Sequence, residues 1–339
     1  MKKIALLVLV TLFSTVGFAQ MQLATLNHND SISAFYGGWA LRDALNAAVN
    51  GDIITLSPGA FQAVNITKAV SIRGAGMSED TIAGTNSTVL LGAFRLRIPN
   101  DLNHRLYMEG LSCAGDMEYD TVYNPYFVKC EFDEVSNYDA SKSIMLTPNF
   151  VNCLIYSFSN YTGQNNNGCA QSPIFINSVI MNMYGNTANY GNWSLLNCVA
   201  FMDCGFMNYG SSRNSILFGT YGSTSTNTFS AYNNIGITTI GAEPYFYSGN
   251  TYYHNNYNFY SYAAVFKTFR GTLGEGITFE LQDSIATKYL GSDGTQIGIY
   301  GGQEPFNPSV RNPQIKKINV AQRSNAEGKL PVDIEIVSE

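Results

Sequence analysis

The chain has 339 residues and a formal net charge of -6, with 45% hydrophobic residues but only 13% charged ones. A soluble domain usually carries about 25% charged residues, so uncharged polar side chains must solvate much of this surface. The composition excludes a charged disordered tail, which combines low hydrophobicity with high net charge. The acidic balance and the lack of a basic run exclude nucleic-acid binding by electrostatic attraction.

The first residues have the pattern of an export signal. Lys2 and Lys3 precede a short apolar stretch, Ile4 to Phe13, and small residues follow as far as Ala19. This order is typical of a cleaved signal peptide, and the apolar stretch is shorter than the roughly 20 residues of a spanning helix. We therefore predict a signal peptide over 1–19, export to the periplasm or the extracellular space, and no membrane span.

One amphipathic helix is predicted soon after the signal. Small and apolar residues recur with helical spacing between 41 and 48, and Asn50-Gly51 supplies a stop. Short apolar strands follow, separated by turns that contain Gly or Pro. We place these strands at 52–56, 64–66 and 69–73.

Two segments resemble a known superfamily. Residues 44–76, ALNAAVNGDIITLSPGAFQAVNITKAVSIRGAG, resemble the N-terminal turns of the pectin-lyase-like right-handed parallel β-helix superfamily, in which a short helix caps the open end of the core. Residues 291–308, GSDGTQIGIYGGQEPFNP, resemble the closing segment of exported bacterial β-helix proteins without an assigned activity. The resemblance covers roughly residues 24 to 320. It implies fold and export but brings no catalytic residues, because lyases, hydrolases and adhesins share this fold.

The middle of the chain repeats a short strand with a period of about 20 residues. Each line has a polar residue, then Cys, Ser or Asn, then an apolar tail, as in NFVNCLIY from 149 and SLLNCVAF from 194. Such a period without a helical pattern predicts stacked coils of short strands, which is a parallel β-helix. The positions that set the register are Cys130, Cys153, Ser178, Cys198, Ser215, Asn234 and Asn256, with Cys113 in an earlier line.

The chain is therefore predicted to be all-β, with a right-handed parallel β-helix over 20–312 and an N-terminal capping helix. After Pro313 the pattern changes, and apolar residues alternate from Leu330 to Ile336 behind a turn at 325–329. We interpret 313–339 as a β-hairpin tail, either a C-terminal cap or the start of a further module.

The residue before each register position is most often Asn. In coils stacked about 4.8 Å apart, each amide can donate to one neighbour and accept from the other, which a carboxylate cannot do. Asn that merely marks turns is the alternative. The predicted structural ladder consists of Asn152, Asn177, Asn197, Asn214 and Asn233.

The six cysteines of an exported chain raise the question of disulfides. The register places Cys113, Cys130, Cys153 and Cys198 in one column, where stacked strands hold Cβ atoms slightly beyond the disulfide range. We predict buried free thiols there, packing like small apolar side chains. A bridge between the two remaining cysteines, Cys169 and Cys204, stays open.

Acidic residues gather in one early coil. Asp116, Glu118 and Asp120 alternate and would face one side of a strand, and pairing Cys113 with Cys130 would stack Asp133 on Asp116. Carboxylates on two adjacent turns can hold calcium, whereas a solvated acidic loop is the alternative. Calcium is the candidate cofactor at these four carboxylates, and no cofactor is required.

Tyrosines crowd an Asn-rich stretch near the end of the coils. On strands, half of them would face the core, and the outward half would form a flat surface on which sugar rings can pack. Glycan binding and core stacking are equal alternatives for this stretch. The candidate glycan-binding residues are Tyr252, Tyr253, Tyr257, Tyr260 and Tyr262, with Trp193 as a second location.

Two functions follow from these observations. Between 143 and 242 the only Asp, Glu, Lys, Arg or His side chains are Asp203 and Arg213. This scarcity favours a non-catalytic exported β-helix that binds a polysaccharide or cell-surface glycan, or serves as a structural solenoid. The alternative is a polysaccharide lyase or glycoside hydrolase acting at the acidic face. Polygalacturonase-like hydrolases use an adjacent Asp pair, and the sequence has none. Catalytic residues stay unassigned, and the sequence leans against an enzyme.

Overall fold

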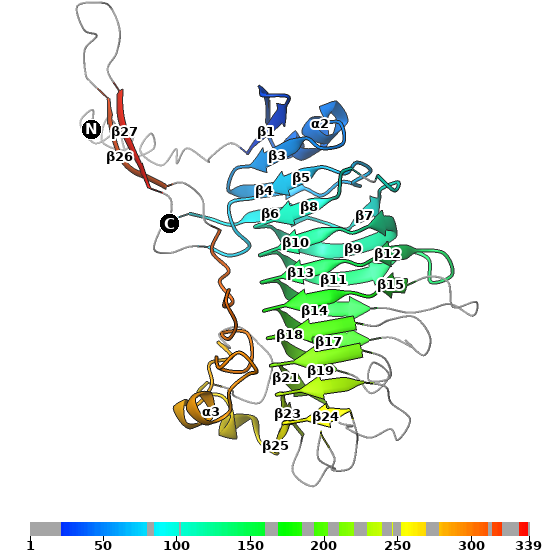
Figure 1. Ribbon diagram of the computed structural model, residues 1–339. Coiled ribbons are helices and arrows are strands. Elements are labelled where there is room, and N and C mark those ends of the chain that lie inside the picture. The colour runs from blue at the N-terminus through cyan, green and yellow to red at the C-terminus, as the bar shows by residue number, and fades with distance from the viewer. Residues whose placement is uncertain are drawn as a thin grey trace, which may run out of the picture.

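The computed structural model describes residues 22–79, 85–101, 103–159, 169–184, 193–202, 210–219, 229–238, 246, 252–268, 278–310, 314–320 and 332–337. Strands make up 48% of the described residues and the helices among them are short. The strands wind into a right-handed parallel β-solenoid, seen as a tall stack in Figure 1. The predicted all-β fold and its handedness are therefore confirmed, while the signal peptide at 1–19 and the turn at 325–329 lie outside the described residues.

Two large sheets form the walls of the solenoid. Among the described residues, sheet A is 12-stranded, in the order β2 (Ser31–Tyr36), β1 (Leu23–His28), β3 (Ile53–Leu56), β5 (Ser71–Arg73), β8 (Tyr107–Glu109), β10 (Tyr126–Val128), β13 (Asn149–Val151), β16 (Ile174–Ile176), β18 (Trp193–Leu196), β20 (Gly210–Arg213), β22 (Ser230–Tyr232) and β24 (Tyr253–His254). From β3 onward its neighbours are parallel, since each strand belongs to the next coil of the chain.

Sheet B forms the second wall. Its main path is β15 (Cys169–Gln171), β12 (Ile144–Leu146), β9 (Ser112–Tyr123), β11 (Glu131–Asn137), β14 (Leu154–Ser159), β17 (Val179–Tyr184), β19 (Val199–Met202), β21 (Ile216–Phe218), β23 (Ile235–Ile237) and β25 (Tyr257–Phe259). Three early strands join it beside β9, namely β4 (Gly59–Gln62), β6 (Thr88–Leu91) and β7 (Phe94–Arg97).

Like residues stack on like residues inside the solenoid, because successive coils repeat the same path. Phe127, Phe150 and Phe175 lie in neighbouring strands of sheet A with ring centroids 4.9 and 5.1 Å apart. Phe132 and Phe158 of sheet B meet this stack edge-on. All five rings are fully buried, so they form the centre of the core.

The predicted register is confirmed from Cys130 to Asn256. The residue after each register position donates its N–H to the previous register residue, as from Leu154 to Cys130 and from Val179 to Cys153, both at 2.9 Å. We call these positions the register column: Cys130, Cys153, Ser178, Cys198, Ser215, Asn234 and Asn256.

Cys113 lies outside the register column, and this corrects the prediction. Cys113 pairs with Phe132, and Ser112 pairs with Glu131, so Leu111 occupies the position beneath Cys130. The thiol prediction itself is confirmed for the described side chains, because Cys113, Cys130, Cys153 and Cys198 are free and buried. Burial raises the pKa of Cys130 and of Cys198 to about 12. The side chains of Cys169 and Cys204 lie outside the described residues.

A left-handed residue precedes each register position and makes the tight turn from sheet A to sheet B. Asn152 has φ 54°, Asn177 45°, and the equivalent residues of the other coils are similar. Asn tolerates this conformation better than most residues, because its short polar side chain can compensate locally. These residues form the turn column: Lys129, Asn152, Asn177, Asn197, Asn214, Asn233 and Asn255.

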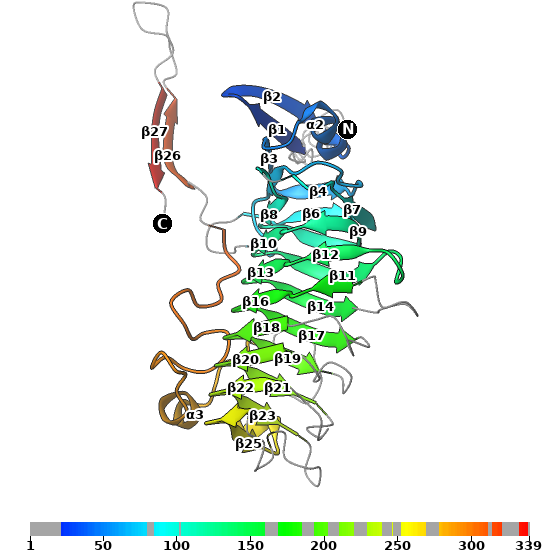
Figure 2. The ribbon, with the colours of Figure 1, turned by 45° about the vertical axis from the view of Figure 1, so that its right-hand side comes forward.

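The N-terminal cap consists of the β1–β2 hairpin and the helix α2 (Ala40–Ala47), which together cover the open end of the stack (Figures 1 and 2). Ala40, Leu41, Ala44 and Leu45 form its buried stripe. Lys68 then caps the helix, because its Nζ donates to the carbonyls of residues 45, 46 and 48 at 2.6–3.1 Å. The predicted capping helix is confirmed.

The chain turns back after the last coil. It passes through a 3-10 turn (Tyr262–Ala264) and a second helix, α3 (Asp283–Lys288), which the sequence analysis did not predict. Residues 291–310, which we call the strap, then run along the edge of the stack toward the N-terminal end (Figure 1). The predicted hairpin tail is confirmed as β26 (Gln314–Val320) paired antiparallel with β27 (Val332–Val337).

This returning segment creates a second apolar core outside the solenoid. Val199, Ile216 and Ile235 face outward from sheet B, yet they are buried. Described residues of 265–266 and 279–299 cover them, including Phe266 and Ile297. We call this cluster the outer core. Among the described residues, no helix is both long enough and apolar enough to cross a membrane.

Candidate functional site

The strap is fastened to the turn column by hydrogen bonds. Asn177 donates from Nδ2 to the carbonyls of Ile299 and Gly301, both at 2.8 Å. Asn152 accepts at Oδ1 from the N–H of Asn307 at 3.0 Å. The turn column therefore holds a distant part of the chain by hydrogen bonds.

Both ends of the strap are fixed in the same way. At one end, Asn214 accepts at Oδ1 from Ser292 N at 2.9 Å, and its carbonyl accepts from Gly298 N at 2.8 Å. At the other end, the ammonium of Lys129 donates to the carbonyl of Ser309. The strap thus follows the turns of successive coils in reverse chain order.

These bonds differ from the predicted asparagine ladder. Asn152, Asn177 and Asn214 bind the strap rather than one another. Within the described residues, Asn197 has a buried Oδ1 without a partner. The φ values show that Asn is present because it makes the turn, which was the alternative interpretation.

A ladder does exist one residue later, in the register column. Ser178 Oγ accepts from Cys153 N, and Ser215 Oγ accepts from Cys198 N, both at 3.0 Å. Asn234 donates from Nδ2 to Asn256 Oδ1, also at 3.0 Å. The side chains at this position face the interior, so their hydrogen bonds join neighbouring coils.

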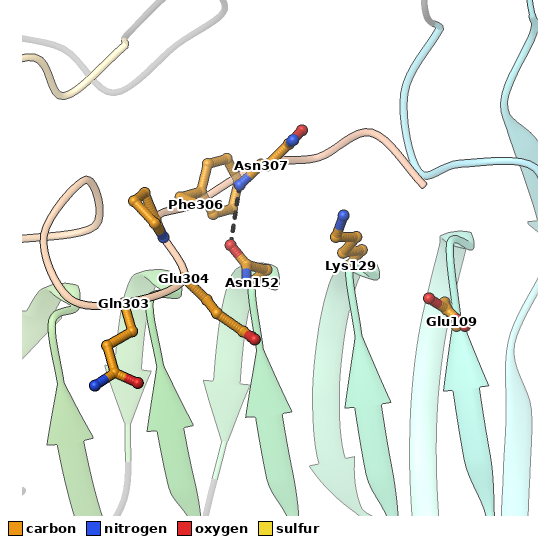
Figure 3. A pocket seen from close by; sticks show the side chains of 8 residues that line it. Glu109, Lys129, Asn152, Gln303, Glu304, Phe306 and Asn307 are labelled. Carbon is orange, nitrogen blue, oxygen red and sulfur yellow. Dashed lines mark hydrogen bonds between the residues drawn. The ribbon is translucent and has the colours of Figure 1, made fainter. Parts of the chain in front are cut away.

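A cavity of about 530 Å³ opens between the strap and the turns of the early coils. Figure 3 shows its two walls: Glu109, Lys129 and Asn152 come from neighbouring coils on one side, and the strap lies opposite. The strap contributes Gln303, Glu304, Pro305, Phe306 and Asn307.

The solenoid wall of this cavity is held in place by aromatic packing. Tyr107 donates its hydroxyl to Glu109 Oε2 at 3.0 Å, and its ring stacks on Tyr126 with centroids 6.0 Å apart. Arg73 lies 4.0 Å from the same carboxylate. Burial, and then the negative charge of Glu109, raise the pKa of Tyr107, so the hydroxyl remains a donor.

On the strap side of the cavity, two polar side chains are free to bind a ligand. Gln303 and Glu304 are exposed, and neither side chain is hydrogen-bonded to another described residue. Phe306 is partly buried against the outer core, and its N–H donates to the carbonyl of Ile299 at 2.7 Å. The cavity therefore combines one aromatic ring with amides, two carboxylates and one ammonium.

The predicted calcium ligands do not converge in the structure. Asp116, Glu118 and Asp120 face outward from one strand as expected, but Glu118 pairs with Arg95 at 3.1 Å and Asp120 with Arg97 at 3.3 Å. The register shifts between Phe132 and Glu134, so Asp116 pairs with Glu134 and Asp133 is not stacked on it. No group of three or more His, Cys, Asp or Glu side chains is placed to hold a metal in the part of the chain that the structure describes.

The aromatic candidates divide between the core and the surface. Trp193 is only 1% exposed and packs against Phe229 at 5.2 Å, so its assignment to a surface site is corrected. The ring of Tyr253 packs edge-on against Phe246. The ring centroids of Tyr257 and Tyr289 lie 4.5 Å apart, and those of Tyr262 and Phe218 lie 5.2 Å apart.

Tyr252 and Tyr260 are the exposed members of the aromatic stretch, at 46% and 44%. They are too few to form the continuous ring-lined surface that was one of the two predicted alternatives. Core stacking therefore accounts for most of the tyrosines in this stretch.

The strap cavity was not found from the sequence. Its solenoid residues and its strap residues are separated by more than 150 positions, and no local pattern joins them. The available signal was the closing segment itself, which is rich in Gly, Pro and polar residues but has no strand or helix pattern of its own.

No protein-family model, curated protein or solved structure matches the chain. The β-solenoid fold therefore rests on the structure, and the function must be argued from the site.

Proposed function

We propose that the chain is an exported, non-catalytic β-helix protein of the pectin-lyase-like superfamily, and that it binds a saccharide in the cavity between the strap and the turn column. The observation that supports this function is the lining of the cavity. A ring, amides and carboxylates surround a volume of about 530 Å³, which is within the range of small-ligand sites.

Saccharides suit this lining for two reasons. Their C–H faces pack on aromatic rings such as Phe306, and their hydroxyl groups both donate and accept hydrogen bonds. Gln303, Glu304 and the Nδ2 group of Asn152 supply both kinds of partner. Since Gln303 and Glu304 make no hydrogen bonds within the described protein, a ligand would not have to displace any.

The test is a glycan array with the mature chain from Gln20, followed by titration of the best ligand. The double substitution Gln303→Ala with Glu304→Ala should weaken binding by at least tenfold, because each hydrogen bond contributes about 1 kcal/mol. Its melting temperature should stay unchanged, since neither side chain is hydrogen-bonded to another described residue. Glu134→Ala, on the sheet B side of the solenoid, is the matched control and should bind normally.

Two results would contradict this function. One is an array without any bound glycan, and the other is unchanged affinity in the double variant. A lyase assay that detects unsaturated uronates, run on the same sample, tests the enzymatic alternative at the acidic face. Activity that is lost in Asp116→Asn would replace the binding function, although the Arg partners of Glu118 and Asp120 weigh against it.

A further inference from the structure

The strand β2 forms the outermost edge of sheet A, at the N-terminal end of the stack (Figure 2). It pairs on one side with β1, from Leu23 opposite Tyr36 to His28 opposite Ser31. No described strand pairs with its other side. The β2 edge is therefore the place where the sheet could continue.

The hydrogen bonds of the hairpin show which residues of β2 have free backbone groups. Gly37 N donates to Gln22 O at 2.8 Å, so these two residues form a hydrogen-bonded pair. Such pairs alternate along an antiparallel ladder, which directs Ser31, Ser33 and Phe35 toward β1. The N–H and C=O groups of Ile32, Ala34 and Tyr36 consequently point away from the protein.

The side chains of these outward-bonding residues are exposed as well. Ile32 is 72% and Tyr36 61% exposed, and both lie with Ala34 on one face of the strand. Proteins usually protect such edges with charges, proline or a bulge. The β2 sequence SISAFY has no charge and no proline, and its pairing with β1 is uninterrupted.

We infer that β2 pairs antiparallel with β2 of a second copy of this chain, across a two-fold axis at Ala34. The three outward-bonding residues are symmetric about Ala34, so each free donor meets a free acceptor of the copy. Ala34 then lies opposite Ala34, and Ile32 lies opposite Tyr36, which brings the two exposed apolar side chains into contact. No like charges meet, because β2 has none. The two solenoids become joined end to end through one continuous sheet.

The first test measures the mass of the mature chain by sedimentation. The wild type should form a concentration-dependent dimer. Ala34→Pro should weaken dimerisation at least 100-fold without changing the melting temperature, because the N–H of residue 34 makes no bond to β1. Ile32→Lys should have the same effect, whereas Leu290→Lys, at the far end of the stack and 41% exposed, should leave the dimer intact.

The second test fixes the register by crosslinking. Hydrogen-bonded residues in antiparallel strands lie about 5.5 Å apart, which suits a disulfide. Ala34→Cys should therefore crosslink to itself under mild oxidation, and Ile32→Cys should crosslink with Tyr36→Cys when the two are mixed. Ser33→Cys and the wild type, which retains its native thiols, are the controls and should not crosslink. A wild type that stays monomeric at its highest soluble concentration, or a dimer that survives Ala34→Pro and Ile32→Lys, overturns this pairing.

Discussion

The outer face of sheet B differs sharply between the early and the late coils. One outward position, followed from coil to coil through the strand register, is Ser112, Glu131, Leu154, Val179, Val199, Ile216 and Ile235. Its early members are partly exposed and bonded to polar neighbours, whereas its late members are buried in the outer core. The same backbone geometry thus forms a solvent-exposed face in the early coils and a buried face in the late coils.

The difference shows that the outward-facing residues of a solenoid indicate which part of its wall is covered by another segment. Inward positions of sheet B are mostly apolar in early and late coils alike, so they indicate little beyond the presence of a coil. Outward positions change from polar to apolar where another segment of the chain lies on the wall. In β21 and β23 every residue is buried, and the alternation that usually marks a strand disappears.

The largest effect is expected from exchanging the two kinds of wall residue. Ile216→Glu should lower the free energy of unfolding by on the order of 4 kcal/mol, because the carboxylate would be buried without water or a partner. Glu131→Ile, the reverse change in the same column, should cost no more than about 1 kcal/mol, since its bonds from Ser112 and Tyr156 lie at the surface. Urea unfolding of both variants gives the measurement. Equal losses would mean that the two halves do not differ as described.

A smaller effect should separate the strap from the turn that it binds. Asn177→Ala and Asn233→Ala both place Ala in a left-handed turn, at a cost of about 1–2 kcal/mol. Asn177→Ala also leaves the carbonyls of Ile299 and Gly301 without their donor, which should add about 2 kcal/mol.

Limited proteolysis supplies an independent readout for this pair. The strap should become sensitive to cleavage in Asn177→Ala but not in Asn233→Ala, whose side chain makes no hydrogen bond to the described residues. If the two variants unfold at the same urea concentration and are cleaved alike, the turn column does not hold the strap.

The smallest effect concerns the N-terminal cap, which is tied to the stack by polar bonds at the surface. Asp101 accepts from the N–H of Asn103, from the ring of His104 and from the side chain of Asn50, and these bonds lower its pKa to about 2. A carboxylate with a lowered pKa stabilises the fold above its unfolded pKa near 4, and this contribution is lost as the pH falls from 4 to 2.

Thermal melts from pH 7 to pH 2 test this contribution. Asp101→Asn should melt slightly below the wild type at pH 7, and the difference should vanish near pH 2. Asp30→Asn, in the exposed turn between β1 and β2, should follow the wild type at every pH. A difference for Asp101→Asn that persists at pH 2 would assign the loss to packing rather than to charge.

Most of the solenoid could be predicted from the sequence because its signals are local. The helical stripe from 41 to 48, the repeated lines from 126 to 259 and the alternating tail each lie within a few residues of one another. The register from Cys130 to Asn256 followed from aligning these lines. Cys113 was misplaced by two residues because Leu111, and not Cys113, lies at the position next to Cys130.

Other features depend on contacts that no short window contains. Trp193 was assigned to the surface, yet it alternates with Leu195 on the inward side, and Gly210 in the next coil leaves room for its ring. Three neighbouring coils repeat a left-handed residue followed by proline, at Asn124, Thr147 and Ser172. This X-Pro repeat is present in the sequence, but it was not used to predict a turn. The strap has no strand or helix pattern of its own, and its hydrogen-bond partners are 78 to 180 positions away.

The strap also sets an order of events in time. A chain that emerges N-terminus first completes the late coils before the covering residues from Val265 onward have been made. The outward valines and isoleucines of these coils therefore stay exposed until then. Contacts over such long separations form slowly, and exposed apolar strands associate with other chains. The protein is therefore most prone to association in the interval when its coils exist and the segment that covers them has not yet been made.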